Sequence, residues 1–230
     1  VMLADGSLFQ YGTNKQTSMG GTKPIEWLGK QLAGIRRFQG ATTHGISVAA
    51  HSLLAYETAR SYLGMNPSTE PTDPNVIEAL LAALLHDVRE CATGDISGPF
   101  LNYWRAKHPE SYASILETES TRFEMTLLMI LDLPLALFEK HSAIVAYVDK
   151  QAMLMEVSYM PPSGRFSFPS PEITPLFDAH DAVDLTSSRE DGYGFTRTLV
   201  TLLAAYRKAT KVVCPPLPTR VNQRVLDNAD

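Results

Sequence analysis

A histidine and an aspartate stand side by side at the end of an apolar segment, in "LLHDVRECATGDISGP" at residues 84–99. The preceding segment is nearly all apolar between Ala79 and Leu85, which predicts a helix from residue 75 to about residue 91 that is buried on every side. We therefore expect Asp87 at or near the core. A buried carboxylate without a partner is costly, so it must be paired, protonated or bound to a metal ion.

His86 taken alone also fits a hydrogen-bonded core histidine. Two further predicted helices change that interpretation. On the helix predicted over residues 46–62, His51 shares one stripe with apolar residues, namely Val48, Leu54 and Ala55. On the helix predicted over residues 134–158, Asp149 likewise stands among apolar stripe neighbours, namely Val145, Ala146, Ala152 and Met153.

Three apolar helix faces therefore each carry a group that can bind a metal. Two histidines and two carboxylates that converge inside a helical bundle form a mixed nitrogen and oxygen site, and the set is His51, His86, Asp87 and Asp149. Buried ion pairs are the alternative. No Lys or Arg lies on the same stripes to pair the carboxylates, so the pattern favours a metal.

The rest of the pattern predicts an all-α fold, because signals for strands are few. Further helices are expected at residues 24–38, 110–131 and 191–209. We expect four parts, which are a loop extension at 1–23, a core domain at 24–160, an irregular segment with the last helix at 161–210, and a loose tail at 211–230. Residues 161–190 are rich in proline and show no clear period, as in functional or flexible segments.

The composition excludes several classes of protein. The net charge of −5 over 230 residues argues against a protein that coats a nucleic-acid polymer. No apolar run approaches the length needed to cross a bilayer, so no membrane partner is expected. The first residues lack the pattern of a secretory signal, and two cysteines make no disulfide framework, so a cytoplasmic setting is expected.

Three segments resemble the HD-domain phosphohydrolases, a family of metal-dependent enzymes with a helical bundle. "RRFQGATTHGISVAAHS" (36–52) is similar to the family's arginine–aromatic start and first metal histidine. "LLHDVRECATGDISGP" is similar to its HD block, and "AYVDKQAML" to its last aspartate ligand. The resemblance covers roughly residues 25–155. The likeness is greatest to small phage, prophage and bacterial members that hydrolyse deoxynucleotides.

The resemblance implies that His51, His86, Asp87 and Asp149 are the metal ligands, with Zn, Mn, Co, Fe or Ni as the ion. It also implies catalytic roles for Glu90 and Asp95. From the residues alone, Glu90 is equally a solvated glutamate one turn after His86, and Asp95 a loop residue that caps a turn. The matched spacing favours the catalytic roles.

The resemblance further implies that Arg37 binds phosphate and that Phe38 flanks the sugar or base, although a core aromatic fits Phe38 equally well. His44 lies two turns before His51 and is a further candidate for substrate binding. Solvent-facing positions are favoured for other nearby cations, namely Arg105, Lys107 and Lys150. Arg89 is unusual between the HD pair and Glu90, where it either assists phosphates or points outwards.

The favoured function is therefore a dATP triphosphohydrolase that attacks the α-phosphorus of a purine deoxynucleotide and releases nucleoside and triphosphate. A 5′-deoxynucleotidase acting on monophosphates is the alternative, and a nucleotide-binding module with an inert site is a distant one. Hydrolysis of cyclic dinucleotides is disfavoured, because "DGYGF" (191–195) is not the motif it needs. Relatives form oligomers, so a homo-oligomer is expected, located in the host cytoplasm if a phage encodes it.

Overall fold

The chain is all-α over the residues that the computed structural model describes, which are 23–40, 45–66, 68–157 and 188–210. The longer helices are α1 (Lys23–Gly34), α2 (Val48–Tyr62), α3 (Pro74–Leu85), α5 (Gly98–Lys107), α7 (Ser120–Ile130), α9 (Ser142–Val157) and α10 (Ser188–Thr210). The short ones are η1 (Arg37–Gly40), α4 (Glu90–Thr93), α6 (Pro109–Tyr112), the π-helix η2 (Ala113–Glu119) and α8 (Leu137–Lys140). The predicted all-α class is confirmed.

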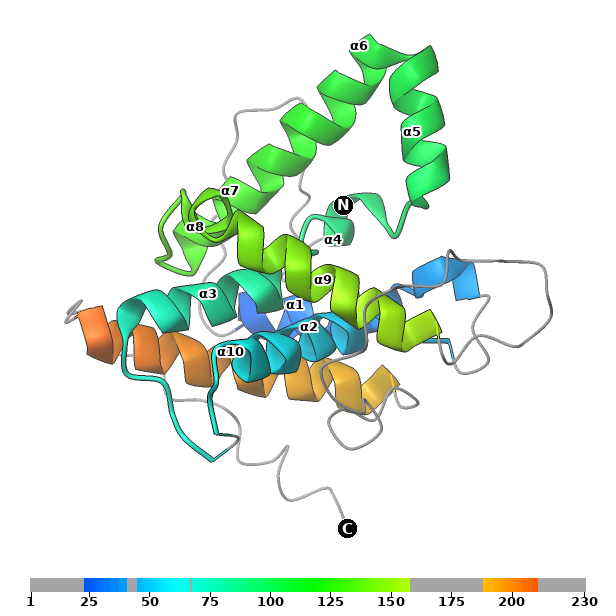
Figure 1. Cartoon of the computed structure of the whole chain (residues 1–230). Helices are drawn as coiled ribbons and strands as arrows, with labels where there is room; N and C mark the ends of the chain where they lie inside the picture. The colour runs from blue at the N-terminus through cyan, green and yellow to red at the C-terminus, as the bar shows by residue number, and fades with distance from the viewer. Residues whose placement is uncertain (1–22, 41–44, 67, 158–187, 211–230) are drawn as a thin grey trace.

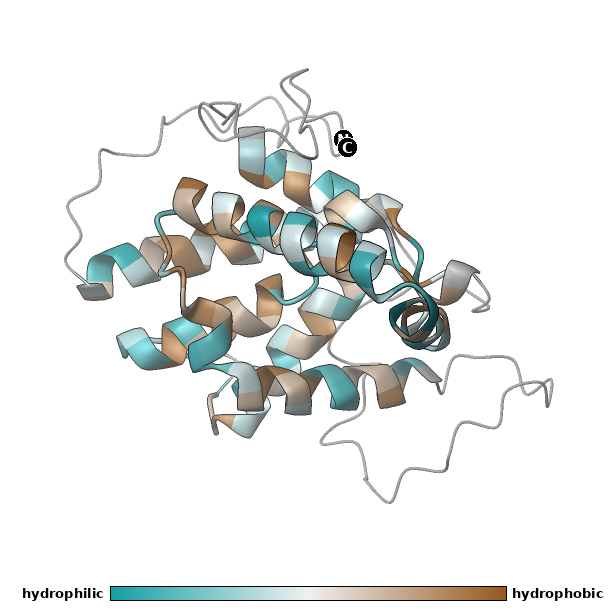
Figure 2. Cartoon of the chain, turned by 90° about the horizontal axis from the view of Figure 1, so that it is seen from above, coloured by the Kyte–Doolittle hydropathy of each residue, from teal (hydrophilic) through white to brown (hydrophobic). Residues whose placement is uncertain are grey.

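Helix α3 is the centre of the bundle, as the apolar segment predicts. Every residue from Ile77 to Leu85 is buried, and α2, α9 and α10 pack around the helix (Figure 1). Helix α1 packs against α10 and α2 on the outside. Figure 2 shows hydrophobic residues gathered on the helix faces that turn towards their neighbours, with hydrophilic residues on the outer faces.

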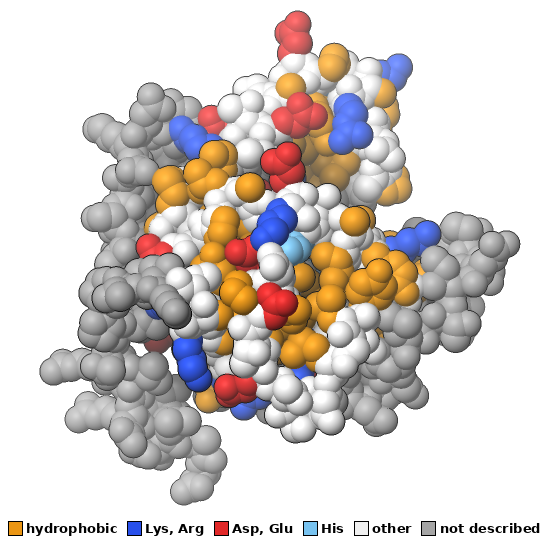
Figure 3. All heavy atoms as spheres, turned by 60° about the vertical axis from the view of Figure 1, so that its left-hand side comes forward, with side chains coloured by type: hydrophobic (Ala, Val, Ile, Leu, Met, Phe, Trp, Pro, Cys, Tyr) orange, Lys and Arg blue, Asp and Glu red, His pale blue; other side chains and the backbone are white. Residues whose placement is uncertain are grey.

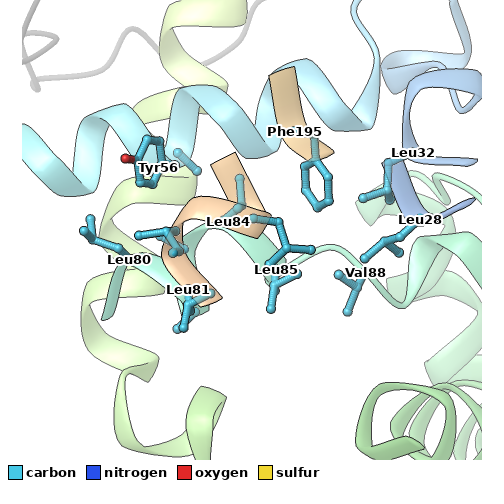
Figure 4. Close-up of a cluster of buried hydrophobic side chains, with 14 of the residues drawn as sticks. Leu28, Leu32, Tyr56, Leu80, Leu81, Leu84, Leu85, Val88 and Phe195 are labelled. Atoms are coloured by element: carbon cyan, nitrogen blue, oxygen red, sulfur yellow. The ribbon is translucent and has the colours of Figure 1, made fainter. Parts of the chain in front are cut away.

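Figure 4 shows how the core is filled. Four leucines of α3 point between the surrounding helices, where Tyr56 of α2 and Phe195 of α10 lie above them. The end of this cluster away from Tyr56 is closed by Leu28 and Leu32 of α1 and by Val88. A fully buried leucine contributes roughly 1.5–3 kcal/mol. The four α3 leucines, Leu80, Leu81, Leu84 and Leu85, are all fully buried, so α3 anchors the bundle.

The contact between α1 and α10 depends on two glycines. A Cβ added to Gly29 would lie 2.6 Å from the carbonyl oxygen of Gly192 and would also collide with Thr196. A Cβ on Gly192 would lie 3.0 Å from the carbonyl oxygen of Gly29. The two helix backbones therefore approach more closely than any side chain allows.

Three predicted helices are divided in the structure. The helix expected at 24–38 ends at Gly34, and η1 begins at Arg37. The helix expected at 75–91 ends at Leu85, and α4 begins at Glu90. His86 Nδ1 donates to Ala83 O at 2.8 Å, the carbonyl that the Asp87 amide would use in a continued α-helix. The following amides bond three residues back instead, as in Val88 N to Leu85 O at 3.0 Å. The helix expected at 134–158 is likewise split into α8 and α9 at His141.

Helices α5, α6, η2 and α7 form an arm that rises away from the bundle (Figure 1). Helix α5 was not predicted from the sequence, and none of its residues is buried. Helices α6, η2 and α7 together span the helix expected at 110–131. At the base of the arm, Trp27 of α1 packs against Phe123 of α7 with ring centroids 6.4 Å apart.

Several predictions fall outside the described residues. They concern the extension at 1–22, His44, the segment 158–187 and the tail 211–230. Among the described helices, none is long and apolar enough to span a bilayer. On the face drawn in Figure 3, charged side chains are scattered among hydrophobic ones. The expected self-association stays a prediction.

We predict that Gly29→Ala lowers the free energy of unfolding by roughly 1–3 kcal/mol, because the added methyl group forces α1 away from α10. Gly34→Ala is the matched control, since a Cβ at Gly34 meets no atom within 4 Å. Urea denaturation of both variants measures the difference. Equal stability of the two variants would show that the close contact does not limit the packing of α1.

Candidate metal centre

Three helices bring their metal-capable groups to one place. His51 lies on α2, His86 follows the end of α3, and Asp149 lies on α9. His51 Nε2 is 3.1 Å from His86 Nε2 and 3.0 Å from Asp149 Oδ1. These three residues form a group that could hold a metal ion. The apolar helix stripes in the sequence predicted that these same three residues converge.

Asp87 lies beside this group. Its Oδ2 is 3.2 Å from His86 Nε2 and 3.5 Å from His51 Nε2. Ligand atoms that each lie about 2.0–2.2 Å from one shared ion are about 3–3.6 Å apart, so the distances from Asp87 Oδ2 to the two imidazoles suit an ion held between them. The group that could hold a metal ion comprises His51, His86 and Asp149, and the role of Asp87 as a fourth ligand stays a prediction.

Hydrogen bonds fix the orientation of both imidazoles. His86 Nδ1 donates to the backbone oxygen of Ala83, and His51 Nδ1 donates to Glu156 Oε1 at 2.8 Å. With both Nδ1 atoms protonated, each neutral ring turns a bare Nε2 towards the centre. Two nitrogen lone pairs then face carboxylate oxygens, an arrangement of acceptors that is stable only with a cation among them.

In the metal-free chain, protons on the histidine rings supply the positive charge that these acceptors need. Burial alone would lower the pKa of His86, but the charge of Asp87 and the hydrogen bond to Asp149 raise it to about 10. The pKa of His51 is also raised, since Glu156 and Asp149 outweigh burial and the charge of Arg37. Burial would raise the pKa values of Asp87 and Asp149, but the two histidines hold both well below the usual range.

The burial of the four groups is uneven. The side chain of His51 is fully buried, whereas those of Asp87 and Asp149 are 21% and 46% exposed. The apolar stripe expected around Asp149 is therefore only partly correct, and its neighbour Ala146 is exposed. The group is closed towards α2 and open to solvent at Asp149, which leaves a side from which a ligand can approach.

Arg37 supplies the cation that the helix stripes lack. Its Nη1 donates to Asp87 Oδ2 at 3.2 Å, and its Nε donates to Glu156 Oε2 at 3.1 Å. The residue is only 9% exposed. The stripes themselves carry no Lys or Arg, as the sequence indicates, but Arg37 reaches Asp87 from η1. Backbone bonds between residues 35–37 and 46–48 bring η1 to the start of α2.

Glu156 is the site residue that sequence reasoning missed. It is fully buried on α9 and contacts both His51 and Arg37 through separate carboxylate oxygens. A carboxylate that accepts from the second nitrogen of a ligand histidine is a recurring partner in metal sites. Glu156 lies seven residues after Asp149, hence two turns along the same helix face, and that spacing was the available signal.

Glu90 lies close enough to Asp87 and His86 for their charges to affect its pKa. Its Oε2 is buried without a hydrogen-bond partner among the described residues. Burial and the charge of Asp87, with a smaller contribution from Asp95, raise its pKa to about 9 against the opposing effect of Arg37. The buried Oε2 does not fit the alternative of a fully solvated helix-end glutamate, and the catalytic role of Glu90 stays a prediction. Glu90 begins α4 instead of continuing α3. A buried, unpartnered carboxyl beside charged groups is suited to acid–base chemistry.

Asp95 and Phe38 are joined by a hydrogen bond. Asp95 Oδ2 accepts from the backbone nitrogen of Phe38 at 2.8 Å. Phe38 adopts a left-handed φ of 54°, an uncommon conformation for an aromatic residue. The guanidinium of Arg37 lies 5.4 Å from the centre of its ring. Asp95 thus holds the turn that carries Arg37, and its catalytic role stays a prediction.

The other cations near the site have partners elsewhere or face solvent. Arg89 lies 3.7 Å from Glu124 of α7, so it points towards the arm. Arg105 donates to the hydroxyl of Tyr112 at 2.6 Å. Lys107 and Lys150 are exposed, as expected. Within the described ranges, Arg37 is therefore the cation most closely tied to the group.

Comparisons with known proteins add no identification to this geometry, since no family model and no curated protein matches the sequence. Sites built from two histidines and a carboxylate can recur on unrelated folds with different functions. The geometry therefore identifies a place that could hold a metal ion. The family suggested by the three sequence segments stays a prediction.

We predict that Zn²⁺ stabilises the wild-type chain and releases protons when it binds at pH 7.5. Proton release follows because the raised pKa of His86 keeps that ring protonated in the metal-free chain, and the ion displaces the proton. Affinity should therefore fall as the pH is lowered. Stabilisation should reach about 2.7 kcal/mol when free Zn²⁺ is about 100 times the Kd. Calorimetry in buffers of different ionisation enthalpy measures both effects.

His86→Ala should abolish both effects. His141→Ala is the control, because His141 is also largely buried and contacts a carboxylate, Glu78, at 3.4 Å outside this group. His141→Ala should bind Zn²⁺ like the wild-type chain. Retention of the Zn²⁺ response by His86→Ala would exclude this group as the metal site.

Proposed function

We propose that the chain is a metal-dependent phosphohydrolase that attacks the α-phosphorus of a deoxynucleotide. The observation that carries the proposal is the convergence of His51, His86 and Asp149, whose donor atoms lie 3.0–3.7 Å apart. Asp87 Oδ2 lies 3.2 Å and 3.5 Å from the two imidazoles. The resemblance of three sequence segments to the HD-domain phosphohydrolases supports the same reaction class.

The proposed ligands suit a divalent transition metal such as Zn, Mn, Co, Fe or Ni, because imidazole and carboxylate groups are mixed. When bound there, such an ion supplies a Lewis acid that polarises a phosphoryl oxygen and makes water more acidic. The chain orients the two imidazoles through Ala83 O and Glu156. The exposed side at Asp149 admits the substrate.

Glu90 is proposed as the acid–base group. In the reaction, a water oxygen bonds to the α-phosphorus, the bond from phosphorus to the 5′-oxygen breaks, and that oxygen takes up a proton. Glu90 has a carboxylate oxygen with no partner among the described residues, so it can hold and transfer a proton there. The support is its burial and its closeness to the charges of Asp87 and His86.

Arg37 is proposed to meet the phosphate. Its Nε and Nη1 are held by Glu156 and Asp87, and in the described part of the chain Nη2 makes no polar contact. A guanidinium that is fixed on one side can present the remaining donors to a phosphate oxygen without losing further side-chain entropy. Phe38 follows it directly and is proposed to flank the sugar or base.

The first-ranked substrate is dATP, split into deoxyadenosine and triphosphate, as in the phage enzymes that the sequence resembles. A 5′-deoxynucleotidase acting on monophosphates is the second candidate, and one observation favours it. Arg89 lies against Glu124, and Arg105 donates to Tyr112, so neither is poised for a longer phosphate chain. Both reactions break the same bond, and the same residues serve either.

Product analysis with metal-loaded protein decides the substrate. Triphosphate and deoxyadenosine from dATP, with dAMP unchanged, are the expected result by chromatography. Phosphate from dAMP, with dATP unchanged, identifies the 5′-nucleotidase. Appearance of dADP would contradict attack at the α-phosphorus, and metal binding without hydrolysis of any deoxynucleotide would point to an inert nucleotide-binding module.

We predict that Glu90→Gln keeps the metal but lowers turnover by about 10²–10⁴-fold, the usual contribution of a general acid or base. The neutral amide preserves the shape of the side chain, so binding of metal and nucleotide should change little. Steady-state rates and metal content measured on the same sample test this. The control is Glu124→Gln, which changes a carboxylate of α7 that pairs only with Arg89 among the contacts found. Unchanged turnover in Glu90→Gln would remove the residue from the mechanism.

A further inference from the structure

Glu156 joins the metal group to Arg37 through its two carboxylate oxygens. Oε1 accepts from His51 Nδ1 at 2.8 Å, and Oε2 accepts from Arg37 Nε at 3.1 Å. Glu156 and the His51 side chain are fully buried, and Arg37 is 9% exposed. Bulk water can therefore scarcely replace either contact.

A carboxylate can satisfy both neighbours, whereas an amide cannot. Glutamine offers one acceptor oxygen and one donor nitrogen, and both His51 and Arg37 need an acceptor from this position. Arg37 stays charged at all relevant pH values, and the structure further ties it to Asp87. His51 can adapt, because a neutral imidazole can move its proton from Nδ1 to Nε2.

We propose that Glu156 is a positioning residue that keeps His51 in the metal-binding tautomer while it holds Arg37 in place. The inference rests on the proposed metal site, but not on the identity of the substrate. Because the carboxylate accepts at both ends, the Nδ1 proton of His51 stays towards Glu156 and Nε2 stays open towards the group. The same contact fixes the guanidinium beside Asp87.

The proposal makes a specific prediction for Glu156→Gln. The amide oxygen should turn to the fixed charge of Arg37, and the amide nitrogen should then donate to His51 Nδ1. The His51 proton must move to Nε2, where it competes with the metal. Affinity for Zn²⁺ should fall about 10–100-fold, the usual cost of losing such a partner. Competition with a chelator measures the affinity. In the metal-free chain, ¹⁵N spectra of the histidine rings should show His51 Nδ1 protonated in the wild type and unprotonated in the variant.

Glu78→Gln is the matched control. Glu78 is also a buried carboxylate with a basic and a hydroxyl partner, Lys140 Nζ at 2.5 Å and Tyr206 OH at 3.3 Å. It stands eight residues before His86, about 12 Å away along α3. Glu78→Gln should lower stability without changing affinity for Zn²⁺. An equal loss of affinity in both variants would show a general effect of removing a buried charge and would overturn the proposal.

A second variant separates positioning from simple loss of charge. In an Arg37→Met background, the amide of Glu156→Gln has no cation to face and can turn its oxygen to His51. The substitution should then cost much less affinity for Zn²⁺ than it does beside Arg37, a difference that a double-mutant cycle isolates. The same cost in both backgrounds would overturn the proposal, as would Zn²⁺ affinity of Glu156→Gln within about twofold of wild type.

The experiment also covers a variant that does not fold and a wild-type chain that lacks metal binding or hydrolysis. If Glu156→Gln does not fold, Glu156→Asp takes its place. It keeps the charge with a shorter reach, and unchanged Zn²⁺ affinity would overturn the proposal. A wild-type chain that binds no Zn²⁺ overturns both the proposed function and this inference. A wild-type chain that binds Zn²⁺ but hydrolyses no nucleotide contradicts only the proposed function, and the affinity measurements still decide the role of Glu156.

Discussion

Unshielded acceptor atoms inside an apolar bundle are the constraint on which this structure depends. His51, His86 and Asp149 bring lone pairs to within 3.0–3.7 Å of one another at the edge of a leucine-rich core. Asp87 adds a carboxylate oxygen 3.2 Å and 3.5 Å from the two imidazoles. Such a group repels itself unless positive charge lies among its members. Helices α2, α3 and α9 hold the acceptors together because the apolar packing of α3 stabilises their arrangement independently.

Positive charge reaches the group through Arg37. Arg37 approaches from η1 and contacts Asp87, while Glu156 returns from α9 to balance Arg37 and His51 together. Acidic and basic side chains therefore contact one another in a continuous series, from Asp149 at the solvent side to the fully buried Glu156. A loose turn at η1 would break this order, and the hydrogen bond from Phe38 to Asp95 fixes that turn.

The sequence predicts the helices of the bundle and the residues on their buried stripes, because a period of 3.6 residues is a local property. His51, His86 and Asp149 could be found in this way. The contact between Arg37 and Asp87 could not, since it depends on how η1 folds back against α2. The end of α3 at Leu85 was also missed, because a ring nitrogen of His86 takes a backbone carbonyl. Glu156 carried a usable signal, seven residues from Asp149, but its two partners come from distant segments.

The exposed helix α5 of the arm has a consequence for local unfolding of the chain. Helix α5 buries none of its residues, whereas α3 buries nine in succession. The free energy needed to expose a backbone amide follows such local burial, from near zero in loose segments to the full unfolding value in the core. Amide protons of α5 should therefore exchange with solvent long before those of α3. The chain therefore combines a slow-exchanging centre, which keeps the acceptors in register, with a fast-exchanging helix α5 at its outside.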